Sequence, residues 1–329
     1  MSQNIVYFSE TILKTLLPWE VLVSTLAEMF HSGCQMPLRH HHQITVPNQE
    51  DATLLVMPAW IEGRYLGVKL VNVFPSNRKQ RLPSISANYL LSCGKTGKIL
   101  ALMDGGELTA RRTAAASVLA AKYLASKKAR HHLMIGTGRL SANIVQAYAT
   151  LLDLKEFRIW GINQEHCEQA AVKIGSMGIT IRPVPVDALN EAVAEADIIS
   201  CATLCHQPVL RGEFLQPGTH VDLIGGFTPG MREADDEVIR KAAVFVDTES
   251  AIKESGDIVM PLRSGLLLED EIQADLYSLC RGKHPGRRSE HEITVFKSVG
   301  SACEDLAAAI LAYQAYGSIN NREELTHAN

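Results

Sequence analysis

The chain has 329 residues, of which 46% are hydrophobic and 21% charged, and its formal net charge at pH 7 is −4. This length accommodates two domains with separate hydrophobic cores. Lys and Arg are spread along the chain rather than clustered, which argues against a nucleic-acid partner.

Several other classes of protein are also disfavoured. The chain has no run of about 18 apolar residues, and residues 1–4 carry no basic region leading into an apolar stretch. We therefore expect no membrane partner and a cytoplasmic location. The seven cysteines are scattered without a C-x-x-C pattern, which is typical of reduced thiols. We expect no metal site, because Cys201, Cys205 and His206 alone are a poor match to known ligand spacings.

The first third of the chain predicts a small mixed domain. Residues 9–31 carry two helical patterns, the second beginning at Pro18 and ending at Gly33. Short apolar segments then alternate with Pro, Asn and Gly turns, which indicates an antiparallel or mixed sheet. These segments are residues 43–46, 52–57, 67–74, 86–92 and 98–103. An alanine-rich helix is predicted over residues 108–125.

An apolar segment at residues 130–135 ends in the pattern G-x-G-x-x-S, made by Gly136, Gly138 and Ser141. In dinucleotide-binding proteins the first glycine makes the tight turn, and the second lets the backbone approach the pyrophosphate. The start of the following helix favours an anion. Glycine turns of this kind also occur without a ligand, so the surrounding elements have to decide.

The elements that follow favour a dinucleotide-binding unit. Strands alternate with helices, as in a parallel sheet covered on both faces. The predicted strands are residues 157–160, 179–184, 197–201, 220–224 and 243–247, and the predicted helices are residues 165–176, 189–196 and 234–242. The nucleotide-binding half is expected from about residue 120 to 300.

The end of the second strand of that unit bears on the choice of coenzyme. An Asp or Glu there would bind the ribose hydroxyls of NAD and repel a 2′-phosphate. The segment reads Gly161-Ile162-Asn163-Gln164, with Glu165 only behind the tip. Asn163 could donate to a 2′-phosphate, so NADP(H) is favoured and NAD(H) stays possible. Alternatively, Asn163 only caps the following helix.

The remaining elements bring the chain back towards its first part. Residues 266–280 read as an amphipathic helix, and residues 281–288 as a solvated basic loop. A strand is predicted at residues 291–296 and a helix at residues 300–316. The polar tail from Gly317 is expected to fray.

Two patterns are fairly specific, L-T-x-x-R-T-A-A at residues 108–115 and F-K-S-V-G at residues 296–300. With shorter pieces from about residue 35 to 315, in matching order, they resemble the ornithine cyclodeaminase and mu-crystallin family. The shorter pieces are residues 58–60 with 67–69, 136–138, 217–220 with 229–230, and 304–306. The resemblance implies an α/β homodimer with a nicotinamide cofactor. A Rossmann domain, residues 120–299, would be inserted in a second α+β domain for substrate binding and dimerisation, residues 1–119 and 300–329.

Family members differ in their chemistry, so the site residues must decide. Members that cyclise ornithine carry an acidic residue directly after a Gly-Gly pair, and here Phe227 follows Gly225-Gly226. A phenyl ring cannot shuttle a proton. Residues 226–236 are instead similar to the branch that reduces 1-pyrroline-2-carboxylate to proline in 3-hydroxyproline breakdown. We expect an NAD(P)H-dependent reductase of cyclic imino acids. The alternatives are an ornithine cyclodeaminase or alanine-type amino-acid dehydrogenase, and a non-catalytic NADPH-binding protein like the crystallins.

Reduction of a cyclic imino acid needs a carboxylate anchor and a proton at the ring nitrogen. Arg39 and Arg112 are candidate anchors, since guanidinium binds carboxylate bidentately, although Arg39 could lie in a solvated loop. Lys69 or a bound water would supply the proton, and without the resemblance Lys69 would read as an exposed strand lysine. Asp305 could pair with Lys69 and set its pKa, or serve as a first-turn helix charge.

The resemblance adds further contacts. Phe227, Thr228 and Val299 would join Arg39, Lys69 and Arg112 at the substrate. Residues expected at the cofactor are Ser84, Arg112, Gly136, Thr137, Gly138, Arg139, Leu140, Asn163, Thr203, Ile224, Met231 and Ser298.

Overall fold

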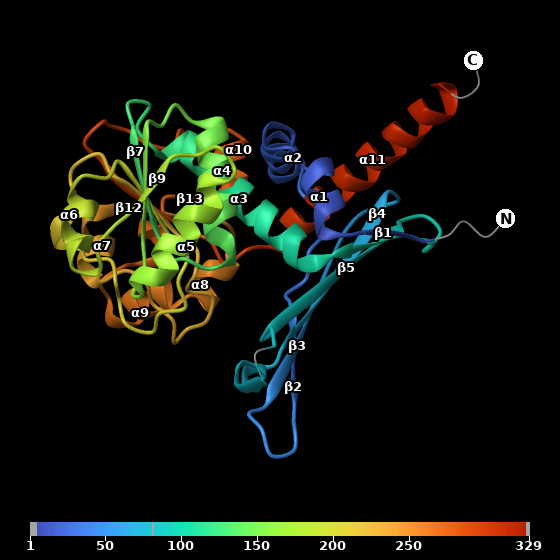
Figure 1. Ribbon diagram of the computed structural model, residues 1–329, viewed down its shortest axis with the longest axis horizontal. Coiled ribbons are helices and arrows are strands. Elements are labelled where there is room, and N and C mark those ends of the chain that lie inside the picture. The colour runs from blue at the N-terminus through green and yellow to red at the C-terminus, as the bar shows by residue number, and fades with distance from the viewer. Residues whose placement is uncertain (1–4, 81, 327–329) are drawn as a thin grey trace. The chain divides into compact units, whose positions relative to one another are not determined.

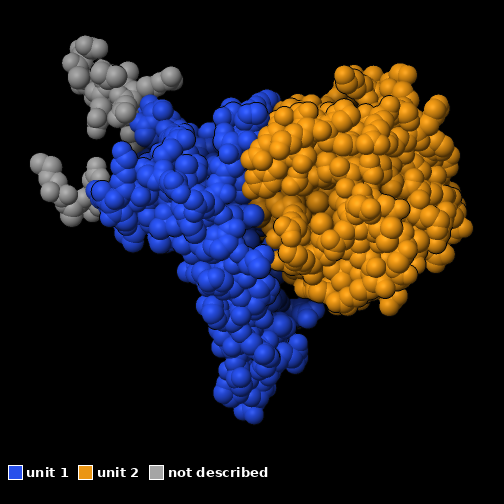
Figure 2. Space-filling view, turned by 180° about the vertical axis from the view of Figure 1, so that it is seen from behind, with its two compact units in different colours: residues 1–112, 302–329 blue, residues 113–301 orange. Residues whose placement is uncertain are grey.

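The computed structural model describes residues 5–80 and 82–326. The chain divides into two compact units, which Figure 2 distinguishes by colour. Unit 1 comprises residues 1–112 and 302–329, and unit 2 comprises residues 113–301. The first division falls within helix α3 (Gly105–Leu124), the alanine-rich helix of the sequence analysis. Unit 2 is thus one continuous segment that interrupts unit 1 in the sequence.

Unit 1 contains a six-stranded sheet (Figure 1). Its neighbours pair antiparallel, except that the first strand pairs parallel with its neighbour. In spatial order the strands are β1 (Val6–Phe8), β6 (Ile99–Asp104), β5 (Ile85–Cys93), β4 (Tyr65–Val73), β3 (Ala52–Ile61) and β2 (His40–Ile44). The mixed sheet expected from the sequence is confirmed, and only the short β1 was missed. A 3₁₀ segment, η1 (Pro75–Gln80), follows β4.

Three helices complete unit 1: α1 (Glu10–Leu16), α2 (Trp19–Ser32) and α11 (Ala302–Thr326). Helix α2 buries Trp19, Leu22, Leu26 and Phe30, a spacing that places them on one face, and α11 packs against it. The tail expected to fray from Gly317 instead continues α11 to Thr326. Polar composition misled the prediction, because Arg, Glu and Leu are good helix formers whatever their polarity.

Unit 2 is built on an eight-stranded sheet in which every described pair is parallel. The spatial order is β13 (Ala274–Asp275), β12 (Ala242–Val246), β14 (Ile293–Lys297), β11 (His220–Leu223), β10 (Ile198–Cys201), β7 (His131–Ile135), β8 (Glu156–Trp160) and β9 (Ile181–Pro183). The chain order reverses between β7 and β10, which is where sheets of this type bind ligands. The predicted parallel sheet is confirmed.

The connecting helices of unit 2 largely match the prediction. They are α4 (Arg139–Leu151), α5 (Gln164–Gly175), η2 (Val186–Ala188), α6 (Leu189–Ala194), η3 (Gly212–Phe214), α7 (Asp236–Lys241) and α8 (Ser250–Glu254). Helix α4 packs beside α5 (Figure 1). One core joins Leu133 and Ile135 of β7 to Val193 of α6 and Val238 of α7.

The amphipathic helix predicted over residues 266–280 is wrong. Helix α9 (Gly256–Ser264) ends before that region, which holds η4 (Glu269–Glu271), β13 and α10 (Leu276–Cys280). Gly265 ends α9 in the left-handed conformation, with φ 74° and ψ 14°. Asp275 starts α10 by accepting a hydrogen bond from the Ser278 backbone N–H at 2.7 Å. These local signals overrode the apolar periodicity. In the described part of the chain, no helix is long and apolar enough to cross a membrane.

A row of buried polar side chains crosses the sheet of unit 2. The Asp222 carboxylate on β11 accepts hydrogen bonds from Ser200 Oγ at 3.2 Å and from the Tyr148 hydroxyl at 3.4 Å. On β7, His132 Nε2 lies 3.0 Å from Ser200 Oγ, and its ring stacks on Tyr148. Burial raises the pKa of Asp222 to about 7, because the charged form loses its hydration.

This row predicts a pH effect on stability. The pKa of Asp222 is raised in the fold, so the contribution of this side chain to the free energy of unfolding is fully present below its unfolded pKa. That contribution is lost as pH rises through about 7. Between pH 6 and pH 8 the loss should be about 1 kcal/mol. In thermal melts, the melting temperature of Asp222→Asn relative to that of the parent protein should therefore rise as pH rises across this range. Groups common to both proteins cancel in that comparison, and equal pH dependence of the two would contradict the assignment.

Candidate active site

A buried ion pair lies in unit 1. Lys69 on β4 is only 2% exposed, and its Nζ lies 2.7 Å from Asp305 Oδ2, in the first turn of α11. Lys69 Nζ is also 3.5 Å from Thr109 Oγ1 on α3. The pair anticipated from the sequence is present, and the alternative that Lys69 is an exposed strand lysine is wrong.

Arg112 on α3 extends this cluster. Its Nε donates to Asp305 Oδ1 at 2.9 Å, and its Nη1 donates to Glu304 Oε2 at 2.8 Å. Both carboxylates are fully buried. Glu304 was not singled out from the sequence, although its place beside Asp305 at a helix start was a usable signal. Arg39, which precedes β2 and is half-buried, lies close enough for its charge to act on Lys69.

The electrostatics of this group, which we call the Lys69 cluster (Arg39, Lys69, Arg112, Glu304 and Asp305), favour an anionic ligand. Burial lowers the pKa of Lys69 to about 8; Asp305 opposes this shift, and the positive charges of Arg112 and Arg39 add to it. Burial disfavours the Asp305 carboxylate, but Lys69 and Arg112 outweigh this and hold its pKa below the usual value. The cluster thus holds two guanidinium groups beside the Lys69 ammonium, and a guanidinium is a good partner for a ligand's carboxylate.

In unit 2, the turn after β7 has the geometry of a pyrophosphate site. Gly136 has φ +118°, and a Cβ there would lie 2.6 Å from the carbonyl oxygen of Ala202, so only glycine fits. Gly138 is the N-cap of α4 and makes no side-chain cap bond. A Cβ on Gly138 would meet nothing within 4 Å, so the backbone is open to a ligand. These residues fit a dinucleotide, whose pyrophosphate the first N–H groups of α4 would bind.

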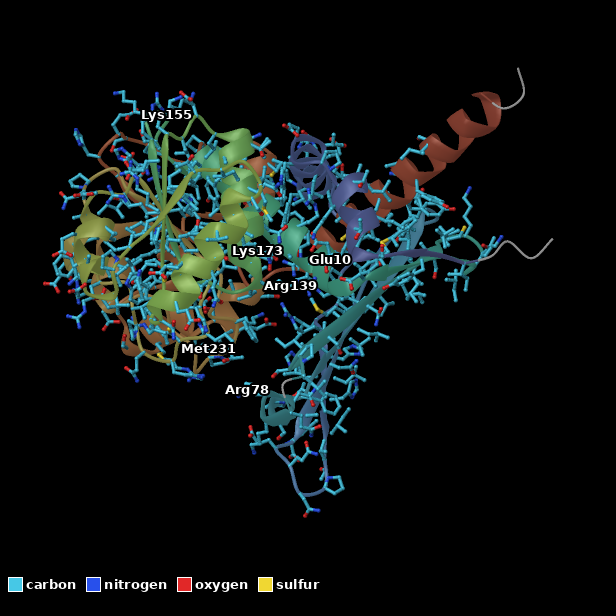
Figure 3. All side chains as sticks on the ribbon, viewed as in Figure 1. Glu10, Arg78, Arg139, Lys155, Lys173 and Met231 are labelled. Atoms are coloured by element: carbon cyan, nitrogen blue, oxygen red, sulfur yellow. The ribbon has the colours of Figure 1, made fainter. Side chains whose placement is uncertain are left out.

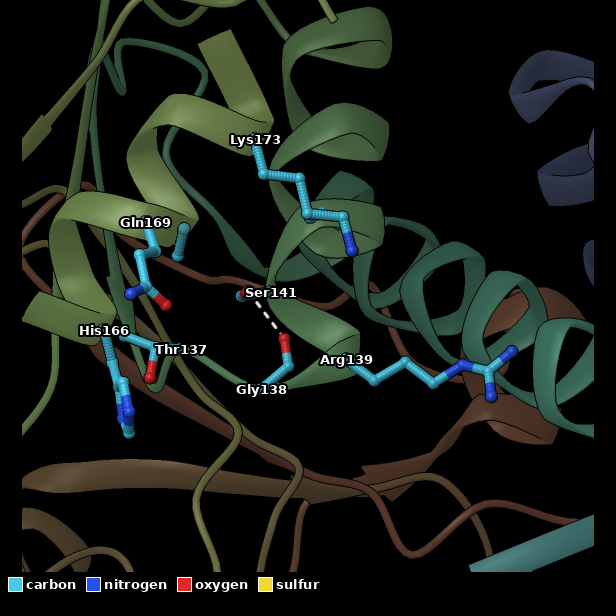
Figure 4. A pocket seen from close by; sticks show the side chains of 9 residues that line it. Thr137, Gly138, Arg139, Ser141, His166, Gln169 and Lys173 are labelled. Atoms are coloured by element: carbon cyan, nitrogen blue, oxygen red, sulfur yellow. Dashed lines mark hydrogen bonds between the residues drawn. The ribbon is translucent and has the colours of Figure 1, made fainter. Parts of the chain in front are cut away.

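A pocket of about 490 Å³ adjoins this turn (Figure 4). It is lined by Thr137, Gly138, Arg139, Ser141, Ala142, His166, Gln169, Ala170 and Lys173. In Figure 4 the Lys173 side chain extends from α5 towards α4, and that of Arg139 extends away from Gly138 and Ser141. Asn163 Oδ1 accepts a hydrogen bond from the His166 N–H at 3.0 Å and so caps α5, as in the alternative interpretation. The sequence analysis did not anticipate His166 and Lys173.

Other residues expected at the cofactor lie at the carboxyl edge of the same sheet. Thr203 follows β10, Ile224 follows β11, and Ser298 follows β14, where its N–H donates to the Leu223 carbonyl at 3.0 Å. Val299 N–H donates to Asp247 Oδ2 at 2.8 Å. Leu140 lies in the first turn of α4.

Four further predicted residues lie outside both the Lys69 cluster and the lining of the pocket beside Gly138. Phe227 is 39% exposed and Thr228 is exposed, whereas Met231 is buried. The carbonyl of Thr228 accepts from the N–H groups of Met231 and Gly256, at 3.0 Å each. In unit 1, the Ser84 carbonyl accepts from the Phe74 N–H at 2.8 Å.

Comparison with known proteins places the chain in a family. The sequence model of the ornithine cyclodeaminase/mu-crystallin family matches residues 13–319. The chain belongs to the ornithine cyclodeaminase/mu-crystallin family. This family member is 43% identical over 326 residues to an uncharacterized protein of Schizosaccharomyces pombe, covering 96% of this chain and 99% of that one.

Two further similarities concern proteins with a named activity. This chain is 39% identical over 259 residues to the Delta(1)-pyrroline-2-carboxylate reductase of Paracoccus denitrificans, covering 78% of this chain and 81% of that one. It also matches the structure of the Thermococcus litoralis Delta(1)-pyrroline-2-carboxylate reductase in complex with NADH and L-proline. The TM-score is 0.88 at 34% identity, covering 96% of this chain and 98% of that one.

Proposed function

We propose that this protein is a nicotinamide-dependent reductase of cyclic imino acids that converts 1-pyrroline-2-carboxylate to L-proline. The observation that carries the proposal is the buried Lys69 cluster, which brings a proton donor and guanidinium groups together, in a chain whose unit 2 fits a dinucleotide. The similarity to reductases of this substrate supports it. Ornithine cyclisation, alanine dehydrogenation and a purely structural role are not favoured.

The reaction adds a hydride and a proton across the C=N bond. A reduced nicotinamide supplies the hydride for the ring carbon when bound. Arg112 binds the substrate carboxylate together with Arg39, and Asp305 and Glu304 fix the orientation of the Arg112 guanidinium. Lys69 holds the proton at the ring nitrogen, and Asp305 keeps its ammonium in place. Phe227, Thr228 and Val299 remain our assignments for further substrate contacts.

The direct test is coenzyme consumption. Adding 1-pyrroline-2-carboxylate to the protein and NADPH or NADH should consume the coenzyme and yield L-proline. Ammonia release from ornithine with catalytic NAD would instead indicate a cyclodeaminase. Tight coenzyme binding without turnover of any imine would indicate a structural protein. Either outcome overturns the proposal. We also propose a homodimer, which light scattering of the purified protein tests.

The pKa of Lys69 predicts the pH dependence. The ammonium that donates the proton is present below about pH 8, so kcat/KM for imine reduction should fall as pH rises through about 8. Oxidation of L-proline needs the neutral amine to accept the proton, so its rate should rise over the same range. Initial rates in both directions check this. Parallel profiles for the two directions would exclude Lys69 as the proton carrier.

We further propose that the coenzyme is NADP(H) rather than NAD(H), with Ser84, Arg139, Asn163 and the rest of the predicted set as contacts. The support is the lining of the pocket beside Gly138, to which Arg139 and Lys173 bring positive charge and His166 an imidazole ring, which suits a 2′-phosphate. Figure 3 shows Lys173 and Arg139 in unit 2.

This preference predicts a selective effect. Lys173→Met should weaken NADPH binding about tenfold, the value of one charged hydrogen bond, and leave NADH binding within about twofold. Dissociation constants from nicotinamide fluorescence measure both. Lys155→Met is the matched control, because Lys155 is an exposed lysine of unit 2 paired with Asp153 and outside the pocket. Equal losses for both coenzymes would contradict 2′-phosphate recognition.

A further inference from the structure

Unit 2 contains a second buried charge cluster that the proposed function does not use. It consists of Glu233, Asp257 of α9 and Lys297 of β14, each fully buried, and we call it the Glu233 cluster. Buried charges are costly unless they are paired and hydrogen-bonded. The partners of this cluster therefore indicate what it does.

The Glu233 carboxylate accepts hydrogen bonds from two loops. Its Oε1 accepts from Thr203 N at 2.7 Å and from Thr203 Oγ1 at 2.8 Å. Its Oε2 accepts from Gly225 N at 2.6 Å and from Gly226 N at 3.3 Å. One carboxylate thus joins the loop after β10 to the loop after β11 with four hydrogen bonds.

The other two members hold Glu233 in place. Asp257 Oδ1 accepts from the N–H groups of Glu233 and Ala234, at 2.8 and 3.1 Å. Lys297 Nζ lies 3.2 Å from Asp257 Oδ2 and 3.9 Å from Glu233 Oε2. The backbone of Glu233 is therefore fixed by one carboxylate, and its side chain faces the only ammonium of the cluster.

The loops after β10 and β11 touch closely, so they have little freedom to move and replace a lost hydrogen bond. A Cβ on Gly225 would lie 1.8 Å from the Thr203 carbonyl and 2.6 Å from Glu233 Oε1. A Cβ on Gly226 would lie 2.6 Å from Asp257 Oδ2. Both glycines are therefore needed for this contact, and the glycine pair preceding Phe227 acquires a physical explanation.

The location of these loops points to one part of the coenzyme. Gly136 and Gly138 follow β7, and the pocket beside them lies towards α5, which follows β8. In the sheet order, β10 and β11 lie on the opposite side of β7. A dinucleotide crosses the sheet at its switch point, so its pyrophosphate and adenosine would use the first side and its nicotinamide half the second.

We propose that Glu233 is a positioning residue that fixes the β10 and β11 loops for the nicotinamide half of the coenzyme, with Asp257 and Lys297 holding it in place. The proposal rests on coenzyme binding by unit 2, and not on the identity of the imino acid. It explains why three charged side chains are buried beside these two loops.

Glu233→Gln is the test variant. It keeps the size of the side chain and leaves Asp257 and Lys297 as a balanced pair, so the protein should fold, with a lower melting temperature because buried N–H groups lose their acceptor. Its amide nitrogen cannot accept, so one of the two loops loses its hydrogen bonds. We expect the dissociation constants of NADPH and NADH to rise about 10- to 100-fold. That of ADP, which lacks the nicotinamide half, should stay within about twofold.

The design separates positioning from general stability. A general structural role would weaken coenzyme and ADP binding in parallel, which would overturn the proposal, as would unchanged coenzyme binding. Glu213→Gln is the control, because Glu213 is exposed and forms an ion pair with Arg211. If Glu233→Gln does not fold, Thr203→Val removes one donor and should raise the coenzyme dissociation constant about 3- to 10-fold, with rescue by Thr203→Ser. Wild-type protein that binds neither coenzyme would refute the proposed function instead.

Discussion

Replacing Lys69 with methionine is expected to lower kcat/KM for 1-pyrroline-2-carboxylate by about 10²- to 10⁴-fold, the usual contribution of a positioned general acid. Methionine fills similar space but cannot donate a proton, and the substrate nitrogen would depend on water. The change also removes the ammonium paired with Asp305 at 2.7 Å. Initial rates over a range of imine concentrations measure this effect.

Coenzyme binding distinguishes this loss from misfolding. NADPH should bind Lys69→Met as it binds the parent protein, because Lys69 belongs to unit 1 and the pyrophosphate turn to unit 2. Lys14→Met is the matched control, since Lys14 is an exposed lysine of unit 1 that pairs with Glu10, and it should retain full activity. Turnover at the parental rate in Lys69→Met would remove Lys69 from the mechanism.

Replacing Arg112 with methionine is expected to destabilise the protein by about 3–5 kcal/mol, because it leaves buried carboxylates without their cation. Arg112 is the partner of Glu304 at 2.8 Å and of Asp305 at 2.9 Å, and all three side chains are buried. Lys69 still pairs with Asp305, so Glu304 bears most of the loss. Urea unfolding followed by circular dichroism measures the change.

A second substitution tests that explanation. Arg112→Met combined with Glu304→Gln removes the stranded charge and should recover a large part of the stability lost in Arg112→Met alone, while activity stays low because the carboxylate anchor is gone. The double-variant cycle gives the coupling free energy between the two residues. Additive effects of the two substitutions would show that Glu304 does not depend on Arg112.

The nucleotide-binding unit was predictable because its signals are local. The strand, the glycine turn at Gly136 and Gly138 and the helix after it are adjacent in sequence, and the strands that follow are short apolar runs. Where a local signal competed with periodicity, the prediction was wrong. Gly265 ends α9 just before the region predicted as one helix, Asp275 starts α10 within it, and helix-forming residues carry α11 past Gly317.

The site was predictable only in part, because its contacts join distant segments. Lys69, Arg112 and Asp305 were predicted from segments that resemble the family. The resemblance did not indicate that Arg112 donates hydrogen bonds to Glu304 as well as to Asp305. Glu233 had no pattern of its own in the sequence. Its hydrogen-bond partners include Thr203, 30 residues earlier in the chain, and Asp257, 24 residues later. Such contacts are decided by tertiary packing, which local spacing does not record.

The order in which the cluster's residues are synthesised follows from the chain's interrupted first unit. Lys69 and Arg112 leave the ribosome before unit 2, and Asp305 and Glu304 only after it. Domains generally fold as they emerge, so unit 2 can reach its native state while the sheet carrying Lys69 still lacks α11. During translation, unit 2 is therefore complete before Lys69 can meet Asp305, so a chain that stops before Ala302 should retain the fold of unit 2 and lack the Lys69 cluster.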